Sequence, residues 1–284
     1  MNVRLYKRFL KKSFAKQWKV LSKLRETAHE DDVIKTFRIL IYHSIHPSYP
    51  LSIRPANFER QMKYLADNKF RVISLDRLQD FLDAEEKGNF IILSFDDGYA
   101  DNFDYAFPIL KDFNLPAIIF LATRFINQDK FDDYYQNARF YPGLRFLNWK
   151  QIDLMLSHGI SFGSHTHSHI DLDNASSEEI EKEIITSKEI IEEKIGKAVH
   201  FFAYPFGQLN NINSKAVGIL NKFGFKFAFS SIWGGFKTVS NPYILPRCLI
   251  DYNDTLEDFQ SKLSGFWDYF RYVHLVKGLI KKAF

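Results

Sequence analysis

The feature that most limits the fold of this chain is a regular alternation of short apolar runs and helical patterns, which begins after Asp32. Most of the runs are continuously apolar rather than alternating in polarity, which is typical of strands buried on both faces of a parallel sheet. Seven or eight strands, each followed by a helix over about 220 residues, predict a (β/α) barrel. The expected strands are Phe37–Tyr42, Phe70–Ser74, Phe90–Phe95, Ala117–Ala122, Ile160–Gly163, His200–Tyr204, Lys226–Ser231 and Tyr243–Ile250.

A doubly wound open sheet is the alternative architecture, but no glycine-rich phosphate turn follows the first apolar run. The length of 284 residues and the hydrophobic content of 46% suffice for one barrel. We therefore expect a barrel over residues 33–255, a basic amphipathic helical extension over residues 1–32, and a helical, aromatic and basic tail over residues 256–284. In such a barrel the chemistry lies where strands end, so polar motifs should directly follow the apolar runs.

Both ends of the chain are basic and aromatic. Residues 1–25 contain nine Lys or Arg and no Asp or Glu, and helical spacing places Phe14 and Trp18 on an apolar side. Such a helix fits the plane of an anionic membrane surface, and Phe266–Tyr272 resembles it. Docking on the barrel or on another subunit is the alternative. Because no apolar stretch of a signal peptide or a membrane span follows, we expect a peripheral protein on the cytoplasmic face of a bacterial inner membrane, or a soluble cytoplasmic one.

The net charge and the cysteine content limit which partners and which covalent cross-links are expected. The net charge of +4 is small against 38 basic and 34 acidic residues, so we expect no nucleic-acid partner. Cys248 is the single cysteine, which excludes an intrachain disulfide.

The first motif, Ser94–Gly98, places two adjacent carboxylates directly after a buried strand. Asp96 and Asp97 should point to different sides of an extended chain, so one can ligate a metal ion while the other faces bound water. Gly98 allows the backbone to turn sharply. The same letters also make an ordinary turn, so this motif alone does not establish a site.

The second motif contains three histidines within five residues, again after a short apolar run. His165 and His169 can converge on a metal ion if the segment turns as a helix does, whereas His167 would then point elsewhere. A solvated polar loop is the alternative. Two His and one Asp leave coordination positions open for water and substrate, as a catalytic site requires.

Two further segments are candidates for contacts with a substrate, one between the two motifs and one after them. In Tyr204–Gly207, the proline and the glycine fix a turn whose backbone N–H groups could face an oxyanion. The long stretch Thr123–Phe146 is rich in aromatic and polar residues. It is either a rim or lid for the substrate or a packed cover over the end of the barrel.

Together and in this order, the motifs resemble those of the polysaccharide deacetylases of the NodB-homology class, carbohydrate esterase family 4. The resemblance spans roughly Ile39 to Ile250 and is carried by Ser94–Gly98, His165–His169, Tyr204–Gly207, Ile41-Tyr42-His43 and Leu245-Pro246-Arg247. It implies a distorted (β/α)₇ barrel that removes N-acetyl groups from amino sugars by metal-assisted hydrolysis.

The resemblance also implies a role for each matching residue. Asp97, His165 and His169 would hold the metal ion, and Asp96 would act as the general base that removes a proton from water. Oxyanion or substrate contacts are expected from Tyr99, Tyr204, Pro205, Phe206 and Gly207.

Two positions depart from the common pattern of the family. Many members carry an arginine two residues before the proline of the third motif, where this chain has Ala203, and the late Leu-x-x-His motif that usually supplies the general acid is absent. Both departures resemble the subgroup that acts on poly-N-acetylglucosamine and related envelope glycans. We therefore expect His43 to be the general acid and Arg247 to orient the base. The alternatives are a hydrogen-bonded strand-end residue for His43 and a surface ion pair for Arg247.

The resemblance favours N-deacetylation of a bacterial surface polysaccharide or of a lipid-linked glycan. Removal of O-acetyl groups from a carbohydrate, and glycan binding by a disabled barrel, are the alternatives. One divalent ion is expected, most readily Zn²⁺, although a site of two His and one Asp also accepts Co²⁺ or Ni²⁺.

Overall fold

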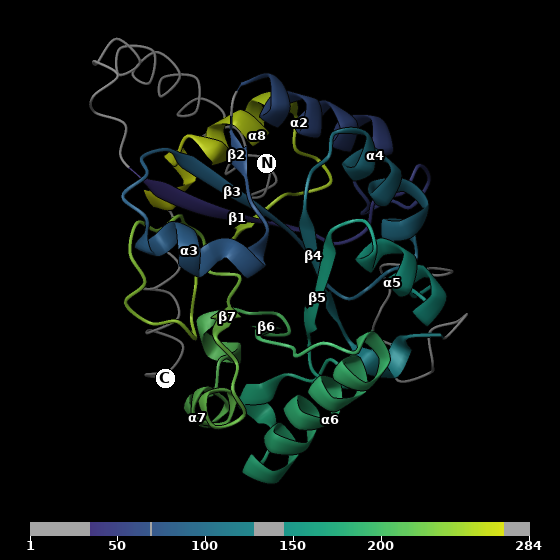
Figure 1. Cartoon of the computed structure of the whole chain (residues 1–284), viewed down its shortest axis with the longest axis vertical. Coiled ribbons are helices and arrows are strands. Elements are labelled where there is room, and N and C mark those ends of the chain that lie inside the picture. Colours follow the sequence, from purple (N-terminus) through teal and green to yellow (C-terminus); the bar gives the residue numbers. More distant parts are fainter. Residues whose placement is uncertain (1–34, 69, 128–144, 270–284) are drawn as a thin grey trace, which may run out of the picture.

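The computed structural model of the protein describes residues 35–68, 70–127 and 145–269 (Figure 1). Within them the strands form one parallel sheet of eight strands. These are β1 (Thr36–Tyr42), β2 (Arg71–Val72), β3 (Asn89–Phe95), β4 (Ala117–Leu121), β5 (Ile160–Ser164), β6 (Phe201–Ala203), β7 (Phe227–Phe229) and β8 (Cys248–Leu249). The α-helices are α2 (Pro55–Asp67), α3 (Leu78–Asp83), α4 (Phe107–Asp112), α5 (Trp149–Leu156), α6 (Ser177–Ile195), α7 (Ser214–Lys222) and α8 (Leu256–Leu263).

The sheet closes on itself. Its strand order is β7-β6-β5-β4-β3-β1-β8, with β2 pairing only with the start of β3. The segment that carries β8 joins the two ends of this order, because Leu245 bridges Phe229 of β7 while β8 pairs with β1. The prediction of a distorted (β/α)₇ barrel is therefore confirmed, and the open doubly wound sheet is excluded.

The helices lie around the outside of the strands, as Figure 1 shows. Three of them begin with a reciprocal cap, in which the residue before the helix and a side chain of its first turn bond each other's backbone. These caps are made by Asn148 for α5, Ser176 for α6 and Thr255 for α8. Such caps fix the residue at which each of these helices begins.

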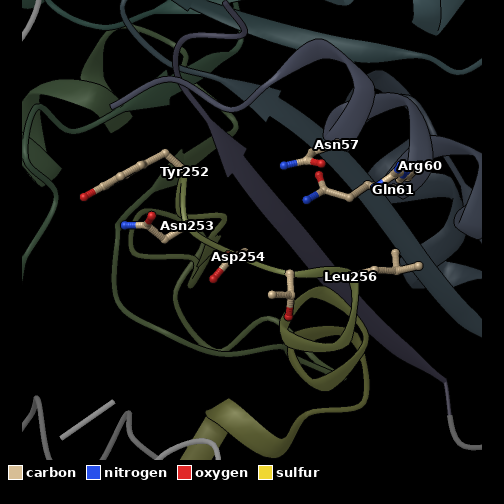
Figure 2. A pocket seen from close by; sticks show the side chains of 8 residues that line it. Asn57, Arg60, Gln61, Tyr252, Asn253, Asp254 and Leu256 are labelled. Carbon is tan, nitrogen blue, oxygen red and sulfur yellow. The ribbon is translucent and has the colours of Figure 1, made fainter. Parts of the chain in front are cut away.

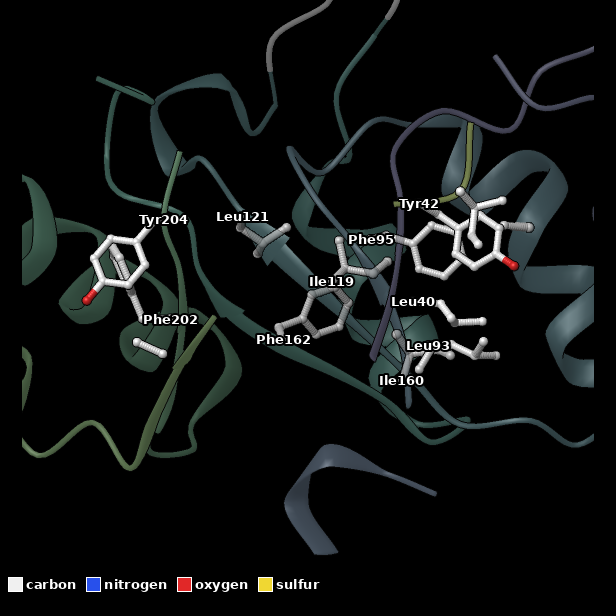
Figure 3. Packing of buried hydrophobic residues seen from close by; sticks show 14 of the residues in the cluster. Leu40, Tyr42, Leu93, Phe95, Ile119, Leu121, Ile160, Phe162, Phe202 and Tyr204 are labelled. Atoms are coloured by element: carbon white, nitrogen blue, oxygen red, sulfur yellow. The ribbon is translucent and has the colours of Figure 1, made fainter. Parts of the chain in front are cut away.

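Alternation along the strands divides the core into two layers. Side chains that point outward pack under the helices; among them are Leu40, Tyr42, Leu93, Phe95, Ile119, Leu121 and Phe162 (Figure 3). Their neighbours point into the barrel and fill it; they include Phe37, Ile39, Phe90, Ile92, Ile118, Phe120, Phe201 and Phe229. Because both faces of the strands are buried, the continuously apolar runs of the sequence are explained.

The first part of the expected C-terminal tail packs on the barrel. Trp267 is buried, lies 5.4 Å from the Trp233 ring and donates to the Ser261 hydroxyl. Arg38 of β1 binds both carboxylate oxygens of Asp268. For residues 256–269 the docking alternative therefore describes the structure. The expected extension over residues 1–32 and the end of the tail lie outside the described residues.

The expected lid segment is described only at its two ends, and residues 128–144 lie outside the described part. Phe125 and Phe146 stack with their ring centroids 5.0 Å apart, and Tyr99 stacks on Phe146 at 5.4 Å. These ends pack over the barrel, as the second alternative predicted for them. Among the described helices, none is long and apolar enough to cross a membrane.

Candidate active site

The two adjacent carboxylates leave β3 in different directions. Asp96 continues the inward-pointing series of Ile92 and Ser94, so its side chain lies inside the barrel mouth with only 3% of the residue exposed. Its backbone N–H donates to the carbonyl of Tyr42, 3.0 Å away, which fixes it against the end of β1. The next residue, Asp97, has a φ of +75°, and this left-handed turn directs its carboxylate toward β5.

Asp97, His165 and His169 converge as the sequence predicted. The Nε2 atoms of His165 and His169 lie 3.5 Å and 3.3 Å from Oδ1 of Asp97. All three ligand atoms lie within 4.8 Å of one another. Bonds of 2.0–2.1 Å to a tetrahedral Zn²⁺ would place neighbouring ligand atoms about 3.3 Å apart. The spacing of these three side chains therefore fits one divalent ion.

The surroundings prepare these residues to act as ligands. Nδ1 of His165 lies 2.8 Å from the carbonyl of Ala203, which can only accept, so Nδ1 carries the proton and Nε2 presents its lone pair toward Asp97. Burial alone would raise the pKa of Asp97, but the imidazoles of His165 and His169 beside it hold that pKa well below its usual value. Asp97 is therefore an anion, as a metal ligand must be.

The predicted base is held by Arg247 in a buried fork. The two Nη atoms of Arg247 lie 2.8 Å from the two carboxylate oxygens of Asp96. Arg247 is fully buried, its Nε donates to the carbonyl of Ser230, and its guanidinium lies 5.5 Å from the ring centre of Phe120. The alternative of a surface ion pair is therefore wrong for Arg247, because the pair lies inside the barrel.

This fork determines the charge on Asp96. Burial pushes the pKa of Asp96 up, but the charge of Arg247, then that of His165, and the hydrogen bonds from Arg247 bring it below its usual value. The Ser94 hydroxyl helps to hold Arg247 in place, because it accepts from Nη1 of Arg247 and donates to the carbonyl of Leu40. Asp96 is therefore ionised and oriented, as a general base must be.

His43 follows β1 at the same edge of the barrel. Its side chain is half-buried and close enough to both Asp96 and Asp97 to influence their charges. Its backbone carbonyl accepts a hydrogen bond of 2.7 Å from the amide of Asn102. His43 therefore stands at the mouth, within the electrostatic reach of the carboxylates, and its role as acid remains a prediction.

A buried polar cluster that the sequence did not reveal holds the segment after β1. The carboxylate of Asp101 accepts from the Ser44 hydroxyl and, at 3.3 Å, from the backbone N–H of Ile45. Ser52 bonds Ser44, and Asn102 bonds both Asp101 and the backbone of His43. Asp101 and Asn102 follow the motif Ser94–Gly98 closely in the sequence, and two polar residues in this position are the signal that could have indicated the cluster. In the structure they lie at the start of a π-helical turn.

Left-handed backbone is concentrated at this mouth. Six non-glycine residues of the described chain have positive φ, and four of them are Asp97, Thr166, His169 and Phe206. The Thr166 hydroxyl accepts from the backbone N–H of His169 at 2.9 Å and so supports the turn between the two histidine ligands. Strained conformations of this kind persist where the surrounding structure enforces them, commonly at functional sites.

In the third motif, Tyr204–Gly207, the turn lies beside the candidate metal ligands, whereas the tyrosine side chain does not. Phe206 is 56% exposed with its ring 5.0 Å from that of His169, so it flanks the ligands. Pro205 precedes it in the turn, and Gly207 is required because a Cβ there would lie 2.6 Å from the backbone nitrogen of Ser231. Tyr204, in contrast, is fully buried and donates to the carbonyl of Tyr243.

Three side chains near the motifs serve packing or local bonding. The ring of Tyr204 lies in the core, and the ring of Tyr99 lies in the aromatic stack with Phe146. Neither position matches the substrate contact that was expected of these two residues. His167 lies 2.9 Å from the hydroxyl of Thr123 and does not join the ligands, as predicted.

A profile of the polysaccharide deacetylase family matches residues 83–228, which is just over half of the chain. The chain belongs to the polysaccharide deacetylase family. It is 27% identical over 228 residues to the poly-β-1,6-N-acetyl-D-glucosamine N-deacetylase of Staphylococcus aureus, a match that covers 76% of this chain and 73% of the relative.

Solved structures show the same fold. A polysaccharide deacetylase from Bacillus cereus superposes with a TM-score of 0.67 at 28% identity, over 81% of this chain and 69% of that one. The Streptococcus pyogenes deacetylase PplD, solved with acetate, gives a TM-score of 0.68 at 24% identity, over 80% and 98% of the two chains. In this polysaccharide deacetylase the family motifs thus meet at the ends of β3, β5 and β6, as expected for the NodB-type barrel.

Proposed function

We propose that this polysaccharide deacetylase is a metal-dependent N-deacetylase of amino sugars in a surface glycan of the poly-N-acetylglucosamine type. The observation that supports this most is the placement of Asp97, His165 and His169 beside the buried pair of Asp96 and Arg247. A ligand set and an ionised base at one barrel mouth are what hydrolysis of an acetyl group requires.

Each residue of the site has a separate role in the proposed reaction. A divalent ion held by Asp97, His165 and His169 supplies Lewis-acid activation when bound. Asp96 accepts a proton from the attacking water, with Arg247 keeping its carboxylate oriented. The backbone N–H of Phe206, at the left-handed turn beside His169, donates to the oxyanion that develops on the acetyl carbonyl.

His43 completes this scheme as the general acid. An amine anion cannot depart in water, so the nitrogen of the sugar must be protonated as its bond to the acetyl carbon breaks. His43 stands at the mouth near both carboxylates, where it can donate that proton. We expect His43→Ala to lower turnover of an N-acetylated oligosaccharide by about 100-fold with unchanged metal content.

An activated ester separates this role from a structural one. The phenolate of p-nitrophenyl acetate departs without an acid, so His43→Ala should cleave this ester at close to the unmutated rate. Equal losses on the amide and on the ester would remove His43 from proton transfer.

The experiment that tests the function compares acetyl substrates directly. The purified protein with added Zn²⁺, Co²⁺ or Ni²⁺ should release acetate from β-1,6-linked N-acetylglucosamine oligosaccharides, and a chelator should abolish that release. Faster release from acetylated xylan would instead support the O-acetyl esterase. No release from any acetylated substrate, with retained glycan binding, would support a disabled binding barrel.

We also propose a peripheral location on an anionic membrane surface, with the cytoplasmic face as the site and a glycolipid precursor as a further substrate class. The nine cations and the apolar side of residues 1–25 support it, because clustered Lys and Arg beside an apolar face bind anionic lipids. Deleting these residues should release the protein from membranes while activity on a soluble oligosaccharide remains. Retention on the membrane after the deletion would contradict this role of the segment.

A further inference from the structure

A hollow lies between the first turns of α2 and α8, away from the candidate ligands. It has a volume of about 390 Å³, and its lining is mostly polar. Figure 2 shows Asn57, Arg60 and Gln61 of α2 on one side and Tyr252, Asn253 and Asp254 of the loop before α8 on the other. None of the residues expected from the sequence to form the site lines it.

The pocket belongs to the same edge of the barrel as the ligands. Helices α2 and α8 begin after the carboxyl ends of β1 and β8, and the ligands follow the carboxyl ends of β3 and β5. Tyr42 links the two places, because its carbonyl accepts from the backbone of Asp96 while its hydroxyl donates to Oε1 of Gln61, each at 3.0 Å. The pocket and the metal ligands therefore lie at the same edge of the barrel and are connected through Tyr42.

One wall of the pocket presents donors. Gln61 is only 2% exposed and its oxygen is occupied by Tyr42, so its amide nitrogen is turned toward the pocket, where no acceptor in the described part of the chain meets it. The amide of Asn57 faces the same way in Figure 2. Arg60 adds an exposed guanidinium that forms no ion pair within the described residues.

The opposite wall is rigid and presents an acceptor and a ring. The Oδ2 atom of Asp254 bonds the buried ammonium of Lys262 and the backbone N–H of Asp251, which leaves Oδ1 to accept from a ligand. Lys262 is itself held by the carbonyl of Leu249 and lies 5.0 Å from the Trp233 ring centre. Tyr252, 38% exposed, offers an aromatic face at the rim.

Donors, an acceptor and an exposed aromatic face suit a sugar ring. Hydroxyl groups both donate and accept, and the C–H face of a pyranose packs on an aromatic ring. A simple anion would be attracted by Arg60 but repelled by Asp254, and an apolar ligand would leave the amides unpaired. We propose that this pocket binds a distal sugar residue of the glycan while the acetylated sugar residue of the same chain lies at the metal ligands Asp97, His165 and His169. This inference rests on the proposed function.

Two linked contacts on one chain strengthen binding, because the second forms intramolecularly. The prediction is therefore a dependence on substrate length. The kcat/KM of the unmutated protein should rise by about tenfold or more from the β-1,6-linked N-acetylglucosamine dimer to the hexamer. Tyr252→Ala and Arg60→Ala should each reduce the hexamer value severalfold, leaving the dimer and p-nitrophenyl acetate within about twofold.

Matched exposed substitutions are the controls. Lys63→Ala removes another cation from α2, and Leu154→Ala removes another exposed apolar side chain, from α5; both should keep the length dependence. Unchanged length dependence in both pocket variants would overturn the inference while the proposed function stood. If the unmutated protein released no acetate, the function would fail instead, and calorimetric titration with the hexamer would decide the pocket: weaker binding by Tyr252→Ala supports it and equal binding overturns it.

Discussion

Two arginine–aspartate ion pairs of nearly the same geometry occupy different regions of the barrel. Near the start of β1, Arg38 binds both oxygens of Asp268 at 2.7 and 2.8 Å. At the mouth, Arg247 binds both oxygens of Asp96 at 2.8 Å. The first pair attaches a C-terminal segment to the outside of the barrel, where the Asp268 side chain is 35% exposed. The second lies inside the barrel beside the ligands, and the Asp96 side chain is 4% exposed.

This difference shows that the neighbours of an ion pair, rather than its geometry, give it a function. Both forks order the chain equally well, because a bidentate contact restricts both partners. Of the two, only the fork at the mouth holds the carboxylate that we propose accepts a proton from the attacking water. Substitutions at the mouth should therefore change the chemistry, and matched substitutions elsewhere should change only stability or nothing.

The largest effect is expected at the ligands. We predict that His165→Ala lowers acetate release by about 1000-fold or more and removes the bound metal, because two protein ligands do not retain it. Metal analysis and turnover of an N-acetylglucosamine oligosaccharide measure both. His167→Ala is the control two residues away and should keep metal and activity; full metal content in His165→Ala would contradict the assignment of the site.

The second-largest effect is expected at Arg247, and it tests the comparison between the two ion pairs. We predict that Arg247→Met lowers turnover by about 100-fold and destabilises the fold by about 3–5 kcal/mol, because it leaves a buried carboxylate unpaired. Without Arg247 the pKa of Asp96 rises, so the acid limb of the pH–rate profile should move to higher pH.

Arg38→Met is the matched control for that experiment. It should also lower stability in denaturant unfolding, by less because Asp268 is partly exposed. Its residual activity should keep the pH profile of the unmutated protein. The comparison fails if both variants shift the profile, or if neither does.

A smaller effect is expected where Asn102 holds the backbone of His43. Asn102→Leu keeps the branched shape of the side chain but removes the donor to His43, so we predict about a tenfold loss on the N-acetylated oligosaccharide and little loss on p-nitrophenyl acetate. Ser261→Ala, which loses a buried hydrogen bond from Trp267 far along the chain, should leave both rates unchanged. Parallel losses on both substrates in Asn102→Leu would indicate a purely structural role.

The smallest effect concerns the pH dependence of stability at Asp101. Burial raises the pKa of Asp101 to about 7. A carboxyl whose pKa is higher in the folded than in the unfolded state stabilises the fold below its unfolded pKa, and this contribution is lost as pH rises to about 7. We predict that the unfolding free energy of the unmutated protein, relative to Asp101→Asn, is larger at pH 5 than at pH 8, by up to about 2–3 kcal/mol. A difference that is independent of pH would contradict this.

The sequence by itself determined the architecture and the chemically distinctive residues. Continuous apolar runs require strands buried on both faces, and a parallel sheet with helices between the strands supplies that burial. Asp96, Asp97, His165 and His169 were identifiable because their types and spacing are unusual and because polar groups just after buried strands meet at one edge of a barrel.

Only the tertiary structure decided how these residues are supported. The pair of Arg247 and Asp96 joins positions 151 residues apart, and no local pattern distinguishes it from the pair of Arg38 and Asp268. The burial of Tyr204 in the core and the contact of Asn102 with His43 likewise depend on which strands become neighbours. The physical reason is that ligand chemistry is encoded in side-chain type, whereas orientation and charge depend on the groups that folding brings within hydrogen-bond distance.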